Sequence, residues 1–256
     1  MRSFLAFFKK ELLETRRSGK LTLLALLFFL FGVMNPSIAK LTPWLMEIMS
    51  ESLAESGMVV AEVTVDALTS WTQFFKNIPM ALIVFLLVYG GCFTKEYEHN
   101  TLIPILTKGL PRYQVVLAKS LTLLLIWSAG YWLCFGVTYG YTVYFWDQTI
   151  VENLVFSSLS WWAFGIWTVG LTVLFSTLAS TSGIVLLGTG STVLASYLLG
   201  LIPKVKKYVP TKLMDGNSLT YGLEAAEDYL PSLIIALSMS GICIGISVLV
   251  FDKKQL

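Results

Sequence analysis

Residues 153–203 read NLVFSSLSWWAFGIWTVGLTVLFSTLASTSGIVLLGTGSTVLASYLLGLIP, which is 51 consecutive residues without a single Asp, Glu, Lys or Arg. A helix that crosses a bilayer needs about 20 mostly apolar residues. The stretch is therefore too long for one span and fits two. Its most polar point, at 180–183, predicts the turn of a helical hairpin.

Four further uncharged runs lie on either side of this hairpin, and each is long enough for one span. They cover 21–39, 77–94, 120–146 and 229–251. We therefore predict an all-α integral membrane protein, with a single transmembrane domain over 1–256. The six spans are expected near 21–41, 77–95, 115–146, 153–179, 183–203 and 231–251.

The composition excludes several classes of protein. Charged residues make up only 13% of the chain and hydrophobic residues 55%, whereas a typical soluble domain has roughly 25% charged residues. A soluble globule, a nucleic-acid-binding protein and a disordered chain are all inconsistent with these values. The chain is expected to be a multi-pass protein of a lipid bilayer.

The distribution of Lys and Arg predicts the orientation, because basic residues favour the cytoplasmic side. With the N-terminus inside, the inner segments hold twice as many of them as the outer segments. We therefore expect both termini in the cytoplasm, a bacterial (inner) membrane location, and extracellular loops at 42–76 and 204–230. The basic residues of 204–212 oppose this arrangement. A cleaved signal peptide over 1–39 is disfavoured, because its 20-residue leader would contain two acidic residues.

The spans lack groups that do chemistry inside a membrane. The five uncharged runs contain no ionisable Asp, Glu, Lys, Arg or His, which argues against a proton-coupled pump, an ion-driven carrier and an intramembrane metalloprotease. No HExxH, GxSxG or Walker sequence occurs. Glu96, Glu98 and His99 are too close in sequence to converge on one metal ion. We therefore predict no catalytic residue, no metal site and no cofactor bound by this chain.

Small and aromatic residues are the notable side chains of the spans. Gly136 and Gly140, like Gly241 and Gly245, have the spacing that lets helix backbones approach closely, although ordinary packing produces the same pattern. Trp127 and Trp132 lie deep in the third span. They fit either a wall of a substrate path or ordinary core packing.

Residues 1–20 are predicted to form an amphipathic elbow helix that lies along the inner leaflet. Its apolar side is made of Phe4, Phe7, Phe8 and Leu12, and Glu11 interrupts that side. A basic N-terminus that only sets the topology is the alternative. Beyond the first span, residues 43–55 place apolar residues and glutamates at near-helical spacing, which predicts either the lining of an exit or an interfacial helix continuing from the span.

The loop between the second and third spans, 95–114, is the most informative segment. Residues 94–113 read TKEYEHNTLIPILTKGLPRY. A short apolar helix over about 101–106 is predicted to expose Leu102, Ile105 and Leu106, before Gly109 and Pro111 break the chain. Exposed apolar clusters usually mark interaction sites, so this loop is expected to bind a partner.

This loop resembles the coupling-helix segment of type-2 ABC exporter permeases, which commonly reads E…GT…LL…P.SR…K. Glu98 matches the acidic residue, 100–101 the Gly-Thr pair, 105–106 the apolar pair, 111–112 the turn and Lys119 the lysine. Asn100 departs from Gly, and the Ser before Arg is missing. The elbow helix, the six spans and the short C-terminal tail match the architecture of the same family.

The resemblance implies a permease without a nucleotide site of its own. A separate ABC ATPase subunit would hold ATP and Mg, and a second permease, either another copy or a homologue, would complete the unit. The cargo would be amphipathic, such as an antimicrobial or toxin-like peptide or a lipid-like molecule, moved outward as in small bacterial peptide-export and immunity permeases. The residues expected to couple to the ATPase are Glu96, Glu98, Thr101, Leu102, Ile105, Leu106, Leu110, Pro111 and Arg112.

Two other classes of function compete with this interpretation. An integral membrane enzyme acting on lipids would need clustered carboxylates or histidines at the interface, and only Glu96, Glu98 and His99 approach this. A membrane scaffold would carry the same loop without moving a substrate. Association with an ABC ATPase separates the exporter from both.

Overall fold

The structure is a computed structural model that describes residues 2–54, 65–98, 101–107 and 109–254. In these ranges it is built of helices, and six of them are long and apolar enough to cross a membrane, which confirms the predicted all-α fold with six spans. These six are α2 (Lys20–Ala54), α3 (Ala67–Tyr89), α6 (Arg112–Phe145), α7 (Leu154–Leu178), α8 (Ser182–Gly200) and α10 (Leu230–Lys253).

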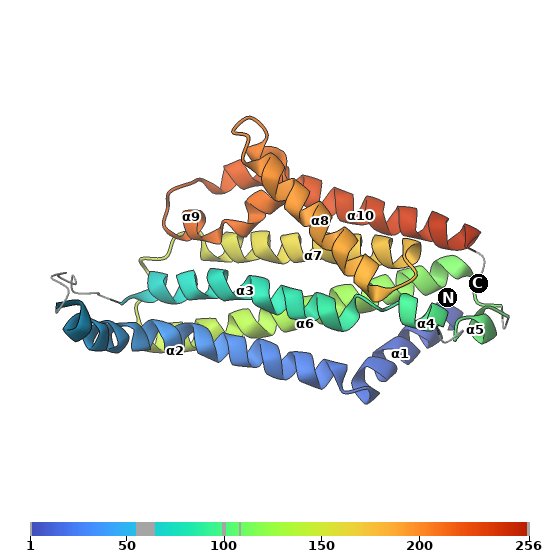
Figure 1. Cartoon of the computed structure of the whole chain (residues 1–256), viewed down its shortest axis with the longest axis horizontal. Coiled ribbons are helices and arrows are strands. Elements are labelled where there is room, and N and C mark those ends of the chain that lie inside the picture. Colours follow the sequence, from blue (N-terminus) through green and yellow to red (C-terminus); the bar gives the residue numbers. More distant parts are fainter. Residues whose placement is uncertain (1, 55–64, 99–100, 108, 255–256) are drawn as a thin grey trace.

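Short helices gather at the two ends of the bundle. Both chain termini lie at the same end, together with α1 and the α4–α5 segment, and we call it the termini end (Figure 1). The far end carries α9 and the 3-10 turns. The short elements are α1 (Arg2–Arg17), α4 (Thr94–Glu98), α5 (Ile103–Thr107), η1 (Lys206–Tyr208), η2 (Pro210–Met214), α9 (Gly216–Thr220) and η3 (Ala226–Tyr229).

Helix α7 is the centre of the bundle. It is apolar on all sides, most of it is buried, and it packs against α6, α8 and α10. A helix that is hydrophobic all round is expected in such a position. At its contact with α6, the ring of Trp127 lies directly on Gly165, where an added Cβ would come within 2.1 Å of the ring. Only glycine permits this approach.

The two GxxxG pairs do not mediate helix contacts within this chain. An added Cβ at Gly136, Gly140, Gly241 or Gly245 would meet nothing within 4 Å. Of the two alternatives, close backbone approach is therefore not found at these positions inside the described part of the chain. The pattern marks a smooth helix face but not which face meets a neighbour.

Helices α2 and α3 extend beyond the predicted span limits. Helix α2 continues to Ala54 with Pro36 and Pro43 inside it, and α3 begins at Ala67, ten residues before 77. The Asp66 side chain accepts a hydrogen bond from the Thr69 amide at 2.9 Å, which caps the start of α3. Residues 42–76 are thus not an extended loop where the structure describes them; 55–64 lie outside the described residues.

The segment 201–229 folds as a compact cap on the far end. The Lys212 side chain is only 4% exposed and forms an ion pair with Glu224, and Lys206 lies 3.4 Å from the same carboxylate. The Tyr229 hydroxyl donates to Glu224 at 2.6 Å. Two of the four lysines that oppose the predicted orientation are therefore neutralised locally.

Candidate functional site

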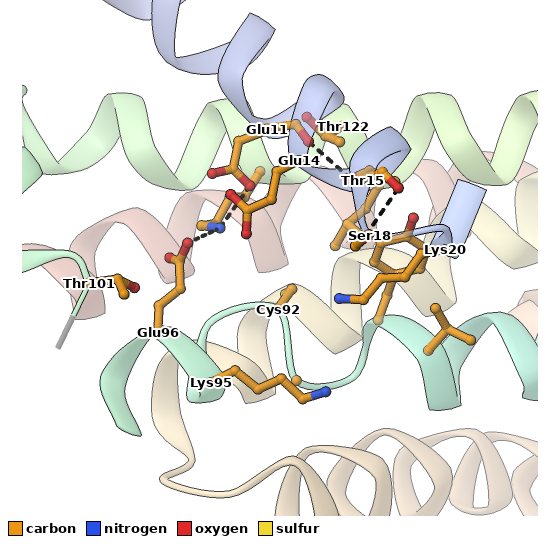
Figure 2. Close-up of a pocket in the computed structure, with 15 residues that line it drawn as sticks. Glu11, Glu14, Thr15, Ser18, Lys20, Cys92, Lys95, Glu96, Thr101 and Thr122 are labelled. Atoms are coloured by element: carbon orange, nitrogen blue, oxygen red, sulfur yellow. Dashed lines mark hydrogen bonds and ion pairs between the residues drawn. The ribbon is translucent and has the colours of Figure 1, made fainter. Parts of the chain in front are cut away.

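A buried ion-pair cluster joins three separate elements at the termini end. Lys119, near the start of α6, has a side chain that is only 5% exposed. Its Nζ lies 2.8 Å from Oε2 of Glu11 in α1 and 2.9 Å from Oε1 of Glu96 in α4. Figure 2 shows Glu11 and Glu96 approaching one another from α1 and α4. We call Glu11, Glu96 and Lys119 the lysine cluster.

The three side chains of the lysine cluster depend on one another, because water solvates none of them well. The two glutamate side chains are each 11% exposed, and removing one partner from a buried ion pair leaves an uncompensated charge. Lys10 adds a second ammonium group, 3.0 Å from Glu11 and 3.7 Å from Glu96. Burial raises the pKa of Glu11, but attraction to Lys119 and Lys10 outweighs it and holds this pKa below its usual value.

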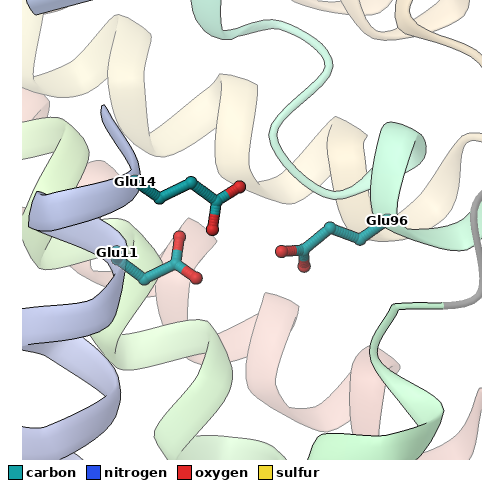
Figure 3. Close-up of side chains that lie close together, drawn as sticks. All are labelled: Glu11, Glu14 and Glu96. Atoms are coloured by element: carbon teal, nitrogen blue, oxygen red, sulfur yellow. The ribbon is translucent and has the colours of Figure 1, made fainter. Parts of the chain in front are cut away.

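Three carboxylates at this site lie close enough together to suggest a cation. They belong to Glu11, Glu14 and Glu96 (Figure 3). Lys119 occupies the position between two of them, and Lys10 lies 2.6 Å from Glu14. Two ammonium groups thus face three carboxylates, and the arrangement is an ion-pair network.

The α4–α5 segment differs from the sequence expectation at Leu102. This residue was expected to be exposed, but it is 1% exposed and belongs to the core. Helix α5 starts later than predicted, at Ile103. The Ile103 side chain is exposed in place of Leu102, with 41% of its surface accessible. Leu106 is half-buried against the core. Ile105 lies in α5, with its side chain outside what the structure describes.

The other residues proposed to couple to the ATPase lie on both sides of α5. Glu98 is exposed at the end of α4, and Thr101 is exposed beside the lysine cluster. Leu110 packs partly against the core, and Pro111 precedes α6 in an extended conformation. His99, Asn100 and Lys108 lie outside the described residues.

Arg112 connects this segment to the end of α10. Its Nη1 donates to the backbone oxygens of Phe251 at 3.1 Å, Asp252 at 3.1 Å and Lys254 at 2.5 Å. The last carbonyls of a helix have no partner within the helix and attract a cation. Arg112 therefore caps α10 at the point where α6 begins.

Lys254 extends the same connection to α7 and α4. Its Nζ donates to the Thr177 backbone oxygen at 2.8 Å, near the end of α7, and lies 3.9 Å from the centre of the Tyr97 ring in α4. Tyr97 also stacks on Phe251. We call Arg112, Lys254 and the helix ends that they contact the C-terminal clamp.

The apolar side of α1 is turned partly toward the protein. Phe7 is 6% exposed and belongs to the core, while Phe4 and Phe8 pack against that core and Leu12 is half-buried. Phe7 therefore faces the protein core and not the inner leaflet. The same orientation explains Glu11, which interrupts the apolar side because it faces Lys119.

The two tryptophans proposed for a substrate path have different surroundings. Trp127 is completely buried, donates from Nε1 to the Trp162 backbone oxygen at 3.2 Å, and packs between Phe28 and Phe85. Trp132 is half-buried and packs on Tyr131. In this conformation Trp127 is a core residue, and its use as a path wall remains a prediction.

The sequence interpretation missed Glu11 and Lys254 as members of the site and used Lys119 only as a motif match. Two signals were present. Glu11 breaks an otherwise apolar helix side, and Lys119 adjoins a 27-residue uncharged run. A charge in such a position is costly without a partner, so each predicts an opposite charge nearby. Lys254 carries no comparable signal.

Comparison with known proteins agrees with this architecture. A family model described as an ABC-2 family transporter protein matches residues 5–215, from α1 to the far-end cap. No curated protein and no solved structure matches the chain. The chain belongs to the ABC-2 family of transporter proteins, and it is a multi-pass membrane permease subunit of an ABC transporter.

Proposed function

We propose that this permease is energised at residues 95–112 by a separate ABC ATPase and that it exports an amphipathic cargo. The supporting observation is that the α4–α5 segment combines an exposed apolar residue, Ile103, with two sets of internal connections. The lysine cluster joins it to α1 and α6. Tyr97 of α4 joins it to Phe251 in α10 and, through Lys254 of the C-terminal clamp, to the end of α7. A partner that moves this segment would move four helices.

The chain's own residues have a mechanical role in this proposal. ATP and Mg are bound and used in the ATPase subunit, whose closure would displace α5. Because ion pairs are strong where water is scarce, Glu96 would carry this displacement to Lys119 and Glu11. Arg112 would carry it to α10. The termini end faces the cytoplasm of a bacterial cell in this proposal.

The surface that the chain presents supports the proposed cargo and the proposed second permease. The uncharged runs offer a passing molecule apolar and hydroxyl groups, which suits an amphipathic peptide or a lipid-like molecule better than an ion. Helices α2 and α8 bury little of themselves within this chain. A second copy or a homologous permease, as well as lipid, would cover these faces.

The docking site is tested by co-expressing the chain with an ABC ATPase encoded beside it and measuring association and ATP hydrolysis. Ile103→Arg places a charge on the proposed apolar contact, and we expect it to abolish association. The matched control is Leu223→Arg, which changes a residue that is 76% exposed at the far end. Failure of the wild-type chain to associate with any ABC ATPase would contradict the exporter and favour the scaffold.

Transmission is tested separately from docking. Glu96→Gln removes one ion pair of the lysine cluster without touching Ile103. We expect the complex to assemble normally while transport-coupled ATP hydrolysis falls by at least about tenfold, which corresponds to roughly 1.4 kcal/mol. Wild-type hydrolysis by this variant would show that the lysine cluster does not couple the ATPase to the spans.

A further inference from the structure

A cavity of about 270 Å³ lies beside the lysine cluster (Figure 2). Its walls are formed by α1, the first residue of α2, the end of α3 with the turn that follows it, α4 and α6. This volume is slightly below the usual range for small-molecule sites, about 300–1,000 Å³. The charged lining is balanced in sign and consists of Glu11, Glu14, Glu96, Lys20, Lys95 and Lys119. Such a lining matches a ligand with both charges better than a simple anion or cation.

Two ammonium groups in this cavity have no carboxylate partner within the described part of the chain. Lys20 and Lys95 form no ion pair with any residue that the structure describes, unlike Lys119. Lys20 begins α2 and Lys95 lies in α4, and Figure 2 shows both side chains extending into the same space. The stem of Lys95 lies over Gly91, where an added Cβ would be 3.1 Å from Cε. A phosphate group is the anion that two such lysines suit.

Two buried polar atoms without hydrogen-bond partners among the described residues also belong to lining residues of the cavity. Glu96 Oε1 binds Lys119, whereas Glu96 Oε2 is buried and has no hydrogen-bond partner among the described residues. The Tyr89 hydroxyl, which also belongs to the lining, is likewise buried and has no hydrogen-bond partner among the described residues. Buried polar atoms in proteins nearly always have a partner. A primary ammonium group would supply one to Glu96, with Glu14 nearby at the rim of the cavity.

The position of the cavity identifies the source of such a ligand. Lys20 directly precedes the uncharged run 21–39, and Leu21, Leu23 and Leu26 of that run are not covered by the chain. The cavity therefore lies where the apolar part of the bilayer gives way to the headgroups. A molecule with its phosphate and amine at this depth and its apolar part against α2 is a phospholipid.

We propose that this cavity binds the headgroup of an aminophospholipid, with its phosphate on Lys20 and Lys95 and its primary ammonium on Glu96 and Glu14. The bound lipid would join α1, α2, α4 and α6 and stabilise the junction on which the lysine cluster depends. The proposal requires only the folded chain. Its test depends neither on transport nor on the ATPase.

The headgroup preference is tested on the purified wild-type chain by native mass spectrometry after exchange into equimolar phosphatidylethanolamine, phosphatidylglycerol and phosphatidylcholine. We expect preferential retention of phosphatidylethanolamine. Phosphatidylglycerol lacks the ammonium group, and the quaternary ammonium of phosphatidylcholine cannot donate to Glu96. Equal retention of the three lipids would overturn the proposal. Soluble glycerophosphoethanolamine should raise the melting temperature of the chain less than the lipid does. An equal increase would contradict the proposal that the ligand is a lipid.

The residues are tested with a matched pair of double variants. Lys20→Gln/Lys95→Gln is expected to lower retention of phosphatidylethanolamine roughly tenfold, because two charge-assisted contacts to phosphate are lost. Lys9→Gln/Lys253→Gln removes the same charge from exposed positions outside the lining and is expected to retain the wild-type preference. Equal losses in the two double variants would show that only general surface charge holds the lipid.

Discussion

Two buried lysines, one at each end of the bundle, are neutralised in different ways. Lys119 at the termini end and Lys212 at the far end have side chains that are 5% and 4% exposed. Lys119 pairs with Glu11 and Glu96, which come from two other elements and are themselves 11% exposed. Lys212 pairs with Glu224, which lies 12 residues away in the same cap and is 28% exposed.

The difference shows what each ion pair can do. Breaking a buried pair is costly mainly because the remaining charge has lost its water. Loss of Lys119 would leave two shielded carboxylates between three helices, with only the partly exposed Lys10 as a counter-charge. Loss of Lys212 would leave one carboxylate that water can reach. The first arrangement can pass a displacement from one helix to another. The second arrangement connects two residues of the same cap and stabilises only that segment.

The largest effect is expected for Lys119→Met. Two buried carboxylates would remain without their central cation, so the free energy of unfolding should fall by about 3–5 kcal/mol. Denaturation of the purified chain in micelles, followed by tryptophan fluorescence, measures the change. A loss no larger than that of Lys212→Met would remove the distinction between the two lysines.

A smaller effect is expected for Lys212→Met. Glu224 keeps access to water, to the Tyr229 hydroxyl and to Lys206, so the loss should be about 1–3 kcal/mol. The same denaturation assay applies, and limited proteolysis of 201–229 should report local opening of the cap. Cleavage near α4 and α5 instead would contradict a local role.

Acid should weaken the far-end pair over a defined range of pH. Burial raises the pKa of Glu224, but hydrogen bonds from Lys212 and Tyr229 outweigh it and lower this pKa from 4.5 to about 2. The stabilisation is therefore complete above about pH 4.5 and is lost as the pH falls toward 2. The stability difference between wild type and Glu224→Gln should shrink over this range. A difference that stays constant would contradict the assignment.

The smallest effect is expected for Lys206→Gln. Its side chain is 50% exposed and its Nζ lies 3.4 Å from Glu224. Exposed pairs contribute about 0–1 kcal/mol, so the midpoint of denaturation should barely change and should depend on salt. A loss comparable to that of Lys212→Met would mean that exposure does not decide the value of these pairs.

Local sequence was sufficient for the spans and insufficient for their ends. The uncharged runs predicted six helices because the length needed to cross a bilayer is fixed by its thickness. The same runs misplaced the start of α3, since the Asp66 cap and the inward-facing Trp71 and Phe74 extend this helix past Lys76. Charge marks where a span leaves the membrane and not where a helix stops.

Local sequence likewise predicted one part of the site and missed another. The segment 95–112 stood out because an apolar cluster between charged residues, outside the spans, is typical of a surface that binds a partner. The sequence did not predict which side of this helix is buried, because a five-residue helix has too few turns to fix its own buried side. Leu102 points inward and Ile103 outward only because of what the rest of the chain places around them.

By itself, the sequence determined that the chain is a six-span membrane protein with one distinctive loop, because hydropathy and motif spacing are local properties. Only the tertiary structure decided that Glu11, Glu96 and Lys119 form one cluster and that Arg112 caps α10. These partners are separated by 23 to 142 residues along the chain. Which charges neutralise one another over such separations depends on how the helices pack, and no local pattern records it.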